Sequence, residues 1–354
     1  MAHRIILRGC TPEPMAAYLK ALAVLRLVSE QVDPQARAWW RGDVFWLESS
    51  LDEDLLVQFF LDRFSPTPIV GPWNGGSGFY EGDRRDGLEA ILGSAAERFH
   101  EYRETIRMIE SLPEMPQKGL RVEELLQRVE SAAEKSTGKK RGALIKLLDG
   151  ARNALPADAQ EIMRSSVEDL KGKGTAKLVA ALKKLRTEVN RRSRASGKGG
   201  IVQACRSRLC DRAVDWMDAA VIFGLDSEPH YPPVLGTGGN EGRLDYTNAF
   251  MDRVAELLLR PRTKISEGLL RNALFGEATS NLEVNSVGQY DPGRAGGYNQ
   301  GPEVETKEIP VNPWNFVLTM EGAVAWCSGV ARRQGISAAQ RTSSPFTVRS
   351  RAVG

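Results

Sequence analysis

The sequence has few of the residues that build metal sites and disulfide frameworks. Among 354 residues there are only four cysteines and three histidines, and they are scattered along the chain. No apolar run approaches the roughly 18 residues of a membrane-spanning helix. The N-terminal apolar run, residues 5–7, is too short for a secretory signal. These absences predict a reduced, cytoplasmic protein with no metal, no cofactor and no membrane partner.

Common enzyme motifs are also missing. The stretch GTGGNEG (236–242) has Glu241 where a dinucleotide-binding fingerprint requires its third glycine. The stretch GGSGF (75–79) has Phe79 where a nucleophile elbow requires its second glycine. No GxxxxGK followed by Ser or Thr, the phosphate-binding P-loop, occurs in the chain. The sequence therefore predicts a protein that is not an enzyme.

Charge of one sign is concentrated in the middle of the chain. The net charge is only +3, but residues 171–198 carry +9 and residues 135–146 carry +5, which leaves −11 elsewhere. Most of these basic residues lack the acidic i,i+4 neighbours of an ordinary solvated helix face. A solvated surface remains the alternative, but this concentration favours a polyanionic partner such as nucleic acid. The candidate phosphate-binding residues are Lys139, Lys140, Arg141, Lys171, Lys173, Lys183, Lys184, Arg191, Arg192, Arg194 and Lys198.

The composition divides the chain into three regions and predicts an α+β fold that is predominantly helical. Residues 1–93 are expected to form a mixed α+β N-terminal domain, and residues 94–200 a basic helical region. Residues 201–354 are expected to form a helix-rich α+β region with long glycine-rich loops. The chain ends without a natural stop, which suggests a fragment of a longer protein.

Several local patterns predict individual elements. Residues 36–40 and 44–48 are expected to form a hairpin around Arg41-Gly42-Asp43. Helices are expected after an N-cap at Thr11 and after an N-cap at Ser50. Prolines and glycines exclude a helix from residues 65–80. In the last region helices are expected at about 202–223, 247–260, 264–275 and 313–331.

Two glycine-rich stretches are candidates for close contact with DNA. Glycine lets backbone amides approach a phosphate or a groove floor where a Cβ atom would clash. Asn74, Gly75 and Gly76 in the first stretch, and Asn240 and Arg243 in the second, suit minor-groove recognition by hydrogen-bond donors. Ordered turns that satisfy their own backbone are the alternative for either stretch.

Four segments, taken together, resemble one known family. They are GCTPEPMAAYLKALAVLRLVSEQ (9–31), PTPIVGPWNGGSGFY (66–80), PPVLGTGGNEGRLDYTNAFM (232–251) and NPWNFVLTMEGA (312–323). We call them the four family-like segments. In this order they are similar to the N-terminal part of the CRISPR-associated large subunit of type I-G (formerly I-U) Cascade.

The resemblance implies a function that is not enzymatic. Large subunits of type I Cascade recognise the protospacer-adjacent motif in target double-stranded DNA, help to open the duplex into an R-loop, and recruit a separate helicase-nuclease. The implied partners are the guide RNA (crRNA), the target DNA, the helicase-nuclease, and other Cascade subunits, both backbone and Cas5-Cas6-like subunits. The basic region would then hold phosphates without sequence preference.

Two alternatives from other functional classes remain open. One is an architectural subunit that binds the guide RNA handle and neighbouring subunits without recognising the DNA motif. The other is a metal-dependent nuclease that uses Asp211, Asp215 and Asp218. Asp211 and Asp215 have i,i+4 spacing on an expected helix, but many solvated pairs have the same spacing.

Overall fold

The computed structural model describes most of the first and last regions of the chain. The described residues are 2–80, 82–115, 198–223, 229–230, 245–260, 263–284, 310–325, 329–332 and 340–343. The chain divides into two compact units, Met1–Leu112 with Val202–Gly354, and Pro113–Ile201. Nearly all of the second unit lies outside the described residues, and the elements below belong to the first unit except where stated.

A small antiparallel sheet begins the chain. Its strands are β1 (His3–Leu7), β2 (Arg37–Arg41) and β3 (Val44–Ser49), in the order β1-β3-β2. The register sets Ile5 opposite Leu47 and Trp40 opposite Phe45. Ile5, Phe45 and Leu47 are buried, as the period of two in a half-buried strand requires. The predicted hairpin is confirmed, and Gly42 in its turn adopts a φ of 61°, which favours glycine.

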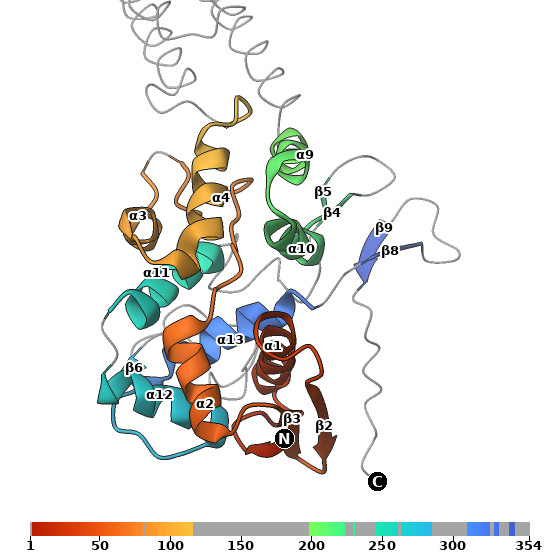
Figure 1. The fold of residues 1–354 in the computed structure, drawn as a ribbon. Helices are drawn as coiled ribbons and strands as arrows, with labels where there is room; N and C mark the ends of the chain where they lie inside the picture. Colours follow the sequence, from red (N-terminus) through yellow and green to blue (C-terminus); the bar gives the residue numbers. More distant parts are fainter. Residues whose placement is uncertain are drawn as a thin grey trace, which may run out of the picture. The chain divides into compact units, whose positions relative to one another are not determined.

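Helices make up most of the remaining described chain, so the molecule is helix-rich with mixed α and β structure (Figure 1). The helical elements are α1 (Met15–Gln31), α2 (Glu53–Gln58), the π-helix η1 (Phe59–Arg63), α3 (Asp86–Gly93), the 3-10 helix η2 (Glu97–Phe99), α4 (His100–Glu110), α9 (Lys198–Arg208, which begins in the second unit), α10 (Asp211–Ala220), α11 (Asp245–Leu259), α12 (Lys264–Phe275) and α13 (Pro313–Ala323). Short antiparallel strand pairs follow: β4 (Ile222–Phe223) with β5 (Pro229–His230), β6 (Glu283–Val284) with β7 (Pro310–Val311), and β8 (Gly329–Arg332) with β9 (Gln340–Ser343).

The core of this unit is built on the contact between α1 and α13, helices nearly 300 residues apart in sequence that lie together in Figure 1. Gly322 of α13 is so close to α1 that a Cβ atom there would lie 1.8 Å from the Leu19 carbonyl oxygen. An aromatic cluster of Phe59, Phe60 and Phe64 packs beside Trp314, with Phe60 edge-on to the indole at 6.1 Å. These four aromatic side chains are fully buried, and removing their large apolar surfaces from water stabilises the packing of η1 and Phe64 against α13.

Two predicted helix starts differ from the structure. α1 begins at Met15 rather than after Thr11, because residues that precede proline, here Thr11 and Glu13, avoid the helical region. The second helix is capped by Asp52, whose carboxylate accepts from the Leu55 amide at 2.8 Å, and not by Ser50. The amide of Ser50 instead donates to Asp33 at the end of the sheet.

Two longer helical predictions also change. The expected helix 202–223 is broken into α9 and α10 at Cys210, whose backbone is extended. The expected helix 313–331 ends at Ala323, because residues 329–332 pair as β8 with β9. The predictions at 247–260 and 264–275 agree closely with α11 and α12.

Helix α4 belongs to the first unit. Its residues Tyr102, Ile106 and Ile109 are buried there, and this unit includes residues up to Leu112. Among the described residues, no helix is both long enough and apolar enough to cross a bilayer.

Candidate functional site

The first glycine-rich stretch is an ordered loop organised by one carboxylate. Asp83 accepts hydrogen bonds from the amides of Gly76 at 2.9 Å, Gly78 at 2.9 Å and Tyr80 at 3.1 Å. Gly78 has a φ of 91°, which explains why glycine is required there. The amide of Gly76, a residue predicted to contact DNA, is thus already bound within the loop, as is the amide of Gly78.

The side chains of this loop are divided between the interior and the surface. Trp73 and Phe79 are buried, so they brace the loop from inside. Asn74 is only 7% exposed, and the Ser77 hydroxyl donates to its carbonyl at 2.7 Å. Gly75 is exposed, and a Cβ atom added there would meet nothing within 4 Å. The surface of the turn is therefore backbone at Gly75 rather than the Asn74 amide.

The loop is fixed to α3 and α11. Arg85 donates to the Gly78 carbonyl at 2.6 Å, and Asn248 of α11 donates to the Arg84 carbonyl at 2.7 Å. The Gly87 amide donates to Asp252 at 2.8 Å, where burial raises the pKa of the Asp252 carboxyl despite the nearby Arg84. Through residues 84–87, these bonds connect the loop 66–80 to α11.

The structure describes one of the remaining predicted site residues. Lys198 is described, and it is the exposed first residue of α9. All other predicted site residues lie outside the described residues: Asn240, Arg243, Lys139, Lys140, Arg141, Lys171, Lys173, Lys183, Lys184, Arg191, Arg192 and Arg194.

A buried polar cluster links three segments that the sequence did not connect. Glu321 of α13 is fully buried, and its carboxylate accepts from the Thr67 amide at 2.8 Å and the Thr67 hydroxyl at 2.7 Å. Arg26 of α1 forms an ion pair with the same carboxylate. Tyr102 lies in this environment, and burial together with the Glu321 charge raises the pKa of its phenol well above the usual value. The two hydrogen bonds and the ion pair compensate the buried charge of Glu321, and they join α1, the loop at 65–80 and α13.

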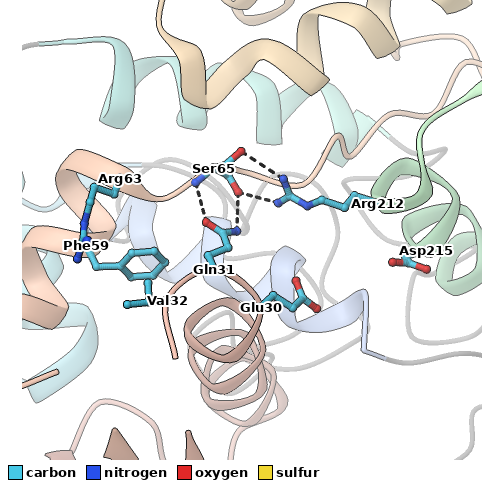
Figure 2. Close-up of a pocket in the computed structure, with 8 residues that line it drawn as sticks. All are labelled: Glu30, Gln31, Val32, Phe59, Arg63, Ser65, Arg212 and Asp215. Carbon is cyan, nitrogen blue, oxygen red and sulfur yellow. Dashed lines mark hydrogen bonds between the residues drawn. The ribbon is translucent and has the colours of Figure 1, made fainter. Parts of the chain in front are cut away.

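An open pocket of about 500 Å³ lies beside this cluster (Figure 2). Gln31 and Ser65 exchange two hydrogen bonds, at 2.9 and 3.0 Å, and Arg212 of α10 donates to the Ser65 carbonyl at 2.7 Å. Figure 2 shows Gln31 and Arg212 approaching Ser65 from different sides. The residues that line the pocket are Glu30, Gln31, Val32, Phe59, Arg63, Ser65, Arg212 and Asp215.

The polar groups of this pocket mainly bind one another. Arg212 also pairs with Glu101 at 2.8 Å, so its guanidinium holds α10, α4 and the loop together. Of the proposed acidic trio on α10, Asp218 pairs with Arg206. Within the described ranges no group of three His, Cys, Asp or Glu side chains could hold a metal ion. The pocket thus shows a structural network rather than a recognisable catalytic arrangement.

Sequence reasoning missed Asp83, Arg212 and Glu321, which organise the site. Asp83 follows the glycines by a few residues, as expected of a carboxylate that binds amides in a turn, and that spacing was a usable signal. Arg212 and Glu321 act over more than 100 residues of sequence, and no local pattern indicates their partners.

In comparisons with protein-family models and with curated proteins, nothing matches this chain.

Proposed function

We propose that this chain is the large subunit of a type I-G Cascade complex and acts in the cytoplasm in antiviral defence. In this role it recognises the protospacer-adjacent motif in target DNA, helps to form the R-loop and recruits a separate helicase-nuclease. It catalyses no reaction itself, and it binds the guide RNA and other Cascade subunits. The guide RNA then specifies most of the target by base pairing, which leaves only a short motif for the protein.

The observation that carries the proposal is the way the four family-like segments fold. Segments 9–31 and 312–323 form α1 and α13, which pack directly on each other. Segment 66–80 joins them through Thr67 and Glu321, and the described end of segment 232–251 belongs to α11, which packs on α13. Segments separated in sequence thus build one scaffold, as expected if all four belong to the framework of a single family.

The charge pattern and the exposed Gly75 turn support the assignment to DNA. The +9 of residues 171–198 suits contact with phosphates that carries no sequence information. The backbone at Gly75 has open space around it, so it could approach the floor of a DNA groove without a side-chain clash. Asn74, Asn240 and Arg243 remain the proposed motif-recognising side chains, and Asn74 would need the loop to open because it is buried.

A selection from a randomised duplex library tests this function with the full chain. We expect the wild type to enrich a short motif, and Gly75→Leu to bind the enriched and scrambled duplexes equally. Gly93→Leu is the matched control, because Gly93 is exposed and a Cβ atom there also meets nothing within 4 Å. Loss of discrimination in both variants would argue against the turn as the site of recognition.

The burial of Asn74 favours a second candidate, an architectural subunit that leaves the motif to other proteins. The same selection separates the two candidates. An architectural chain would enrich no motif, while replacing Lys183, Lys184, Arg191 and Arg192 by alanine would still weaken its binding to RNA. For duplex recognition, we expect those four changes to flatten the slope of log K against log salt by about 0.9 for each lost phosphate contact.

A further inference from the structure

The outward face of the three-stranded sheet combines aromatic rings with arginines. Trp46 on the central strand β3 lies opposite Trp39 of β2 and opposite Ile6 of β1. These three residues therefore form one row across the sheet. Trp39 is 37% exposed, and Arg4, Arg37 and Arg41 are exposed around it. We call Arg4, Ile6, Arg37, Trp39, Arg41 and Trp46 the outer sheet face.

The opposite face of the same sheet is the one that the fold uses for packing. Phe45 and Leu47 are buried there, and Trp40 stacks on Tyr18 of α1 with centroids 5.1 Å apart. The Trp40 indole also donates to the Cys10 carbonyl at 3.0 Å. Figure 1 shows α1 next to β2 and β3. Trp40 is thus explained by the core, whereas Trp39 and Trp46 are not.

The two outward indoles have a geometry suited to stacking. Their ring planes differ by 4° and their centroids are 6.5 Å apart, so they form a nearly parallel pair on neighbouring strands. Exposing a large aromatic ring to water is unfavourable, and a pair of them on a sheet face indicates a ligand that covers them. Nucleobases stack on such rings because every base has a π face.

The charges on the face identify the partner as an anion. Among the outward positions of β1, β2 and β3, one residue is acidic. This residue is Glu48, and the Arg4 guanidinium donates to its carboxylate at 2.8 Å. Arg37 and Arg41 form no ion pair within the part of the chain that the structure describes. Two guanidinium groups that form no ion pair with the described residues therefore flank the rings, although Arg37 lies opposite Glu48 in the register. Such an arrangement complements a phosphate backbone with unpaired bases.

We propose that the outer sheet face binds single-stranded DNA, with bases stacked on Trp39 and Trp46 and phosphates held by Arg37 and Arg41. DNA is favoured over RNA because the outward residues Ile6 and Val44 near the two indoles are apolar. A ribose 2′-hydroxyl laid against the indoles, Ile6 and Val44 would lose water without gaining a partner. A duplex does not fit, because its bases are already stacked on one another. This inference does not depend on the proposed Cascade function.

Fluorescence anisotropy with the full chain and labelled oligo(dT) of about ten nucleotides tests the proposal. We expect Trp39→Ala to weaken binding about tenfold and Trp39→Phe to retain most of it, since a phenyl ring still offers a face on which a base can stack. Replacing both Arg37 and Arg41 by glutamine should flatten the salt slope by about 0.7 per lost contact. Arg63→Gln, which removes one positive charge from an exposed arginine on η1, is the control for charge loss away from this face.

Three outcomes would overturn the proposal. Unchanged oligo(dT) binding by Trp39→Ala would exclude the face as a stacking site. Equal weakening for a duplex of the same length would point to a general effect on the fold. Binding of oligo(rU) as tight as that of oligo(dT) would overturn the choice of DNA. Gly75→Leu, the variant that tests motif recognition, should leave oligo(dT) binding unchanged, so failure of one proposal is distinguishable from failure of the other.

Discussion

Glycine serves opposite purposes in two regions of this molecule. At the contact between α1 and α13, Gly322 is present because the neighbouring backbone leaves no room for a Cβ atom. In the turn that Asp83 organises, Gly75 has open space around it and is exposed. The first glycine is explained by packing, whereas nothing in the fold requires the second.

The two regions also differ in how they hold a carboxylate. Glu321 is fully buried and binds a cation and two donors from distant segments. Asp83 binds three amides of its own loop, a few residues away in sequence. A buried charge left without its partners is costly, whereas a loop carboxylate acts mainly on local order. The comparison therefore predicts global effects in one region and local effects in the other.

Gly322→Ala is expected to have the largest effect. The added methyl would meet the backbone of Leu19 rather than a flexible side chain, so α1 and α13 must separate. We expect a loss of more than about 3 kcal/mol in the free energy of unfolding, beyond the usual cost of overpacking. Urea denaturation measures it.

The control for this prediction has the opposite sign. Gly268 lies within α12, and a Cβ atom there meets nothing within 4 Å. Gly268→Ala should stabilise the protein by about 0.5–1 kcal/mol, since alanine is the better helix former. Equal stability of both alanine variants would contradict the packing role of Gly322.

Glu321→Gln is expected to have a smaller but still global effect. The amide keeps the shape of the side chain but leaves the Arg26 guanidinium, which is 13% exposed, without its buried counter-charge. We expect a loss of about 3 kcal/mol in the free energy of unfolding, the lower end for breaking a buried pair.

Glu30→Gln provides the comparison for this change, because Glu30 pairs with the same arginine at 2.9 Å but is exposed. Its loss should cost less than about 1 kcal/mol, as for surface pairs in general. If thermal or urea unfolding showed the two variants to be equally stable, the buried cluster would have no special role.

Asp83→Asn is expected to have the smallest effect on global stability. One carboxylate oxygen becomes an amide donor, so at least one of the three loop amides loses its acceptor. We expect a loss of about 1 kcal/mol and faster hydrogen exchange at Gly76, Gly78 and Tyr80. The hydrogen-exchange rates of amides in α1 and α13, measured by NMR, should be unchanged.

Asp43→Asn, in the exposed turn between β2 and β3, is the matched control. It should alter neither the exchange of the loop amides nor the free energy of unfolding. Faster exchange throughout the molecule in the Asp83 variant would instead place that carboxylate in the global core.

Much of the fold was accessible from local sequence patterns, and the errors have specific causes. The hairpin, the loop at 65–80, α11, α12 and the start of α13 follow from alternation, proline and glycine content, and helical periodicity. Thr11 and Ser50 failed as caps because proline geometry and a tertiary bond to Asp33 overruled the local preference. The predicted site was less accessible: the burial of Asn74 depends on distant packing.

The sequence by itself determined where most of the strands, turns and helices form, because these depend mainly on neighbours within a few residues. It also determined the concentration of charge in residues 135–198. Only the tertiary structure decided which of two adjacent tryptophans, Trp39 and Trp40, faces water and which glycine faces a backbone. It also paired Arg26 and Thr67 with Glu321. Such choices depend on segments far apart in the chain, and a local pattern contains no information about which of them will meet.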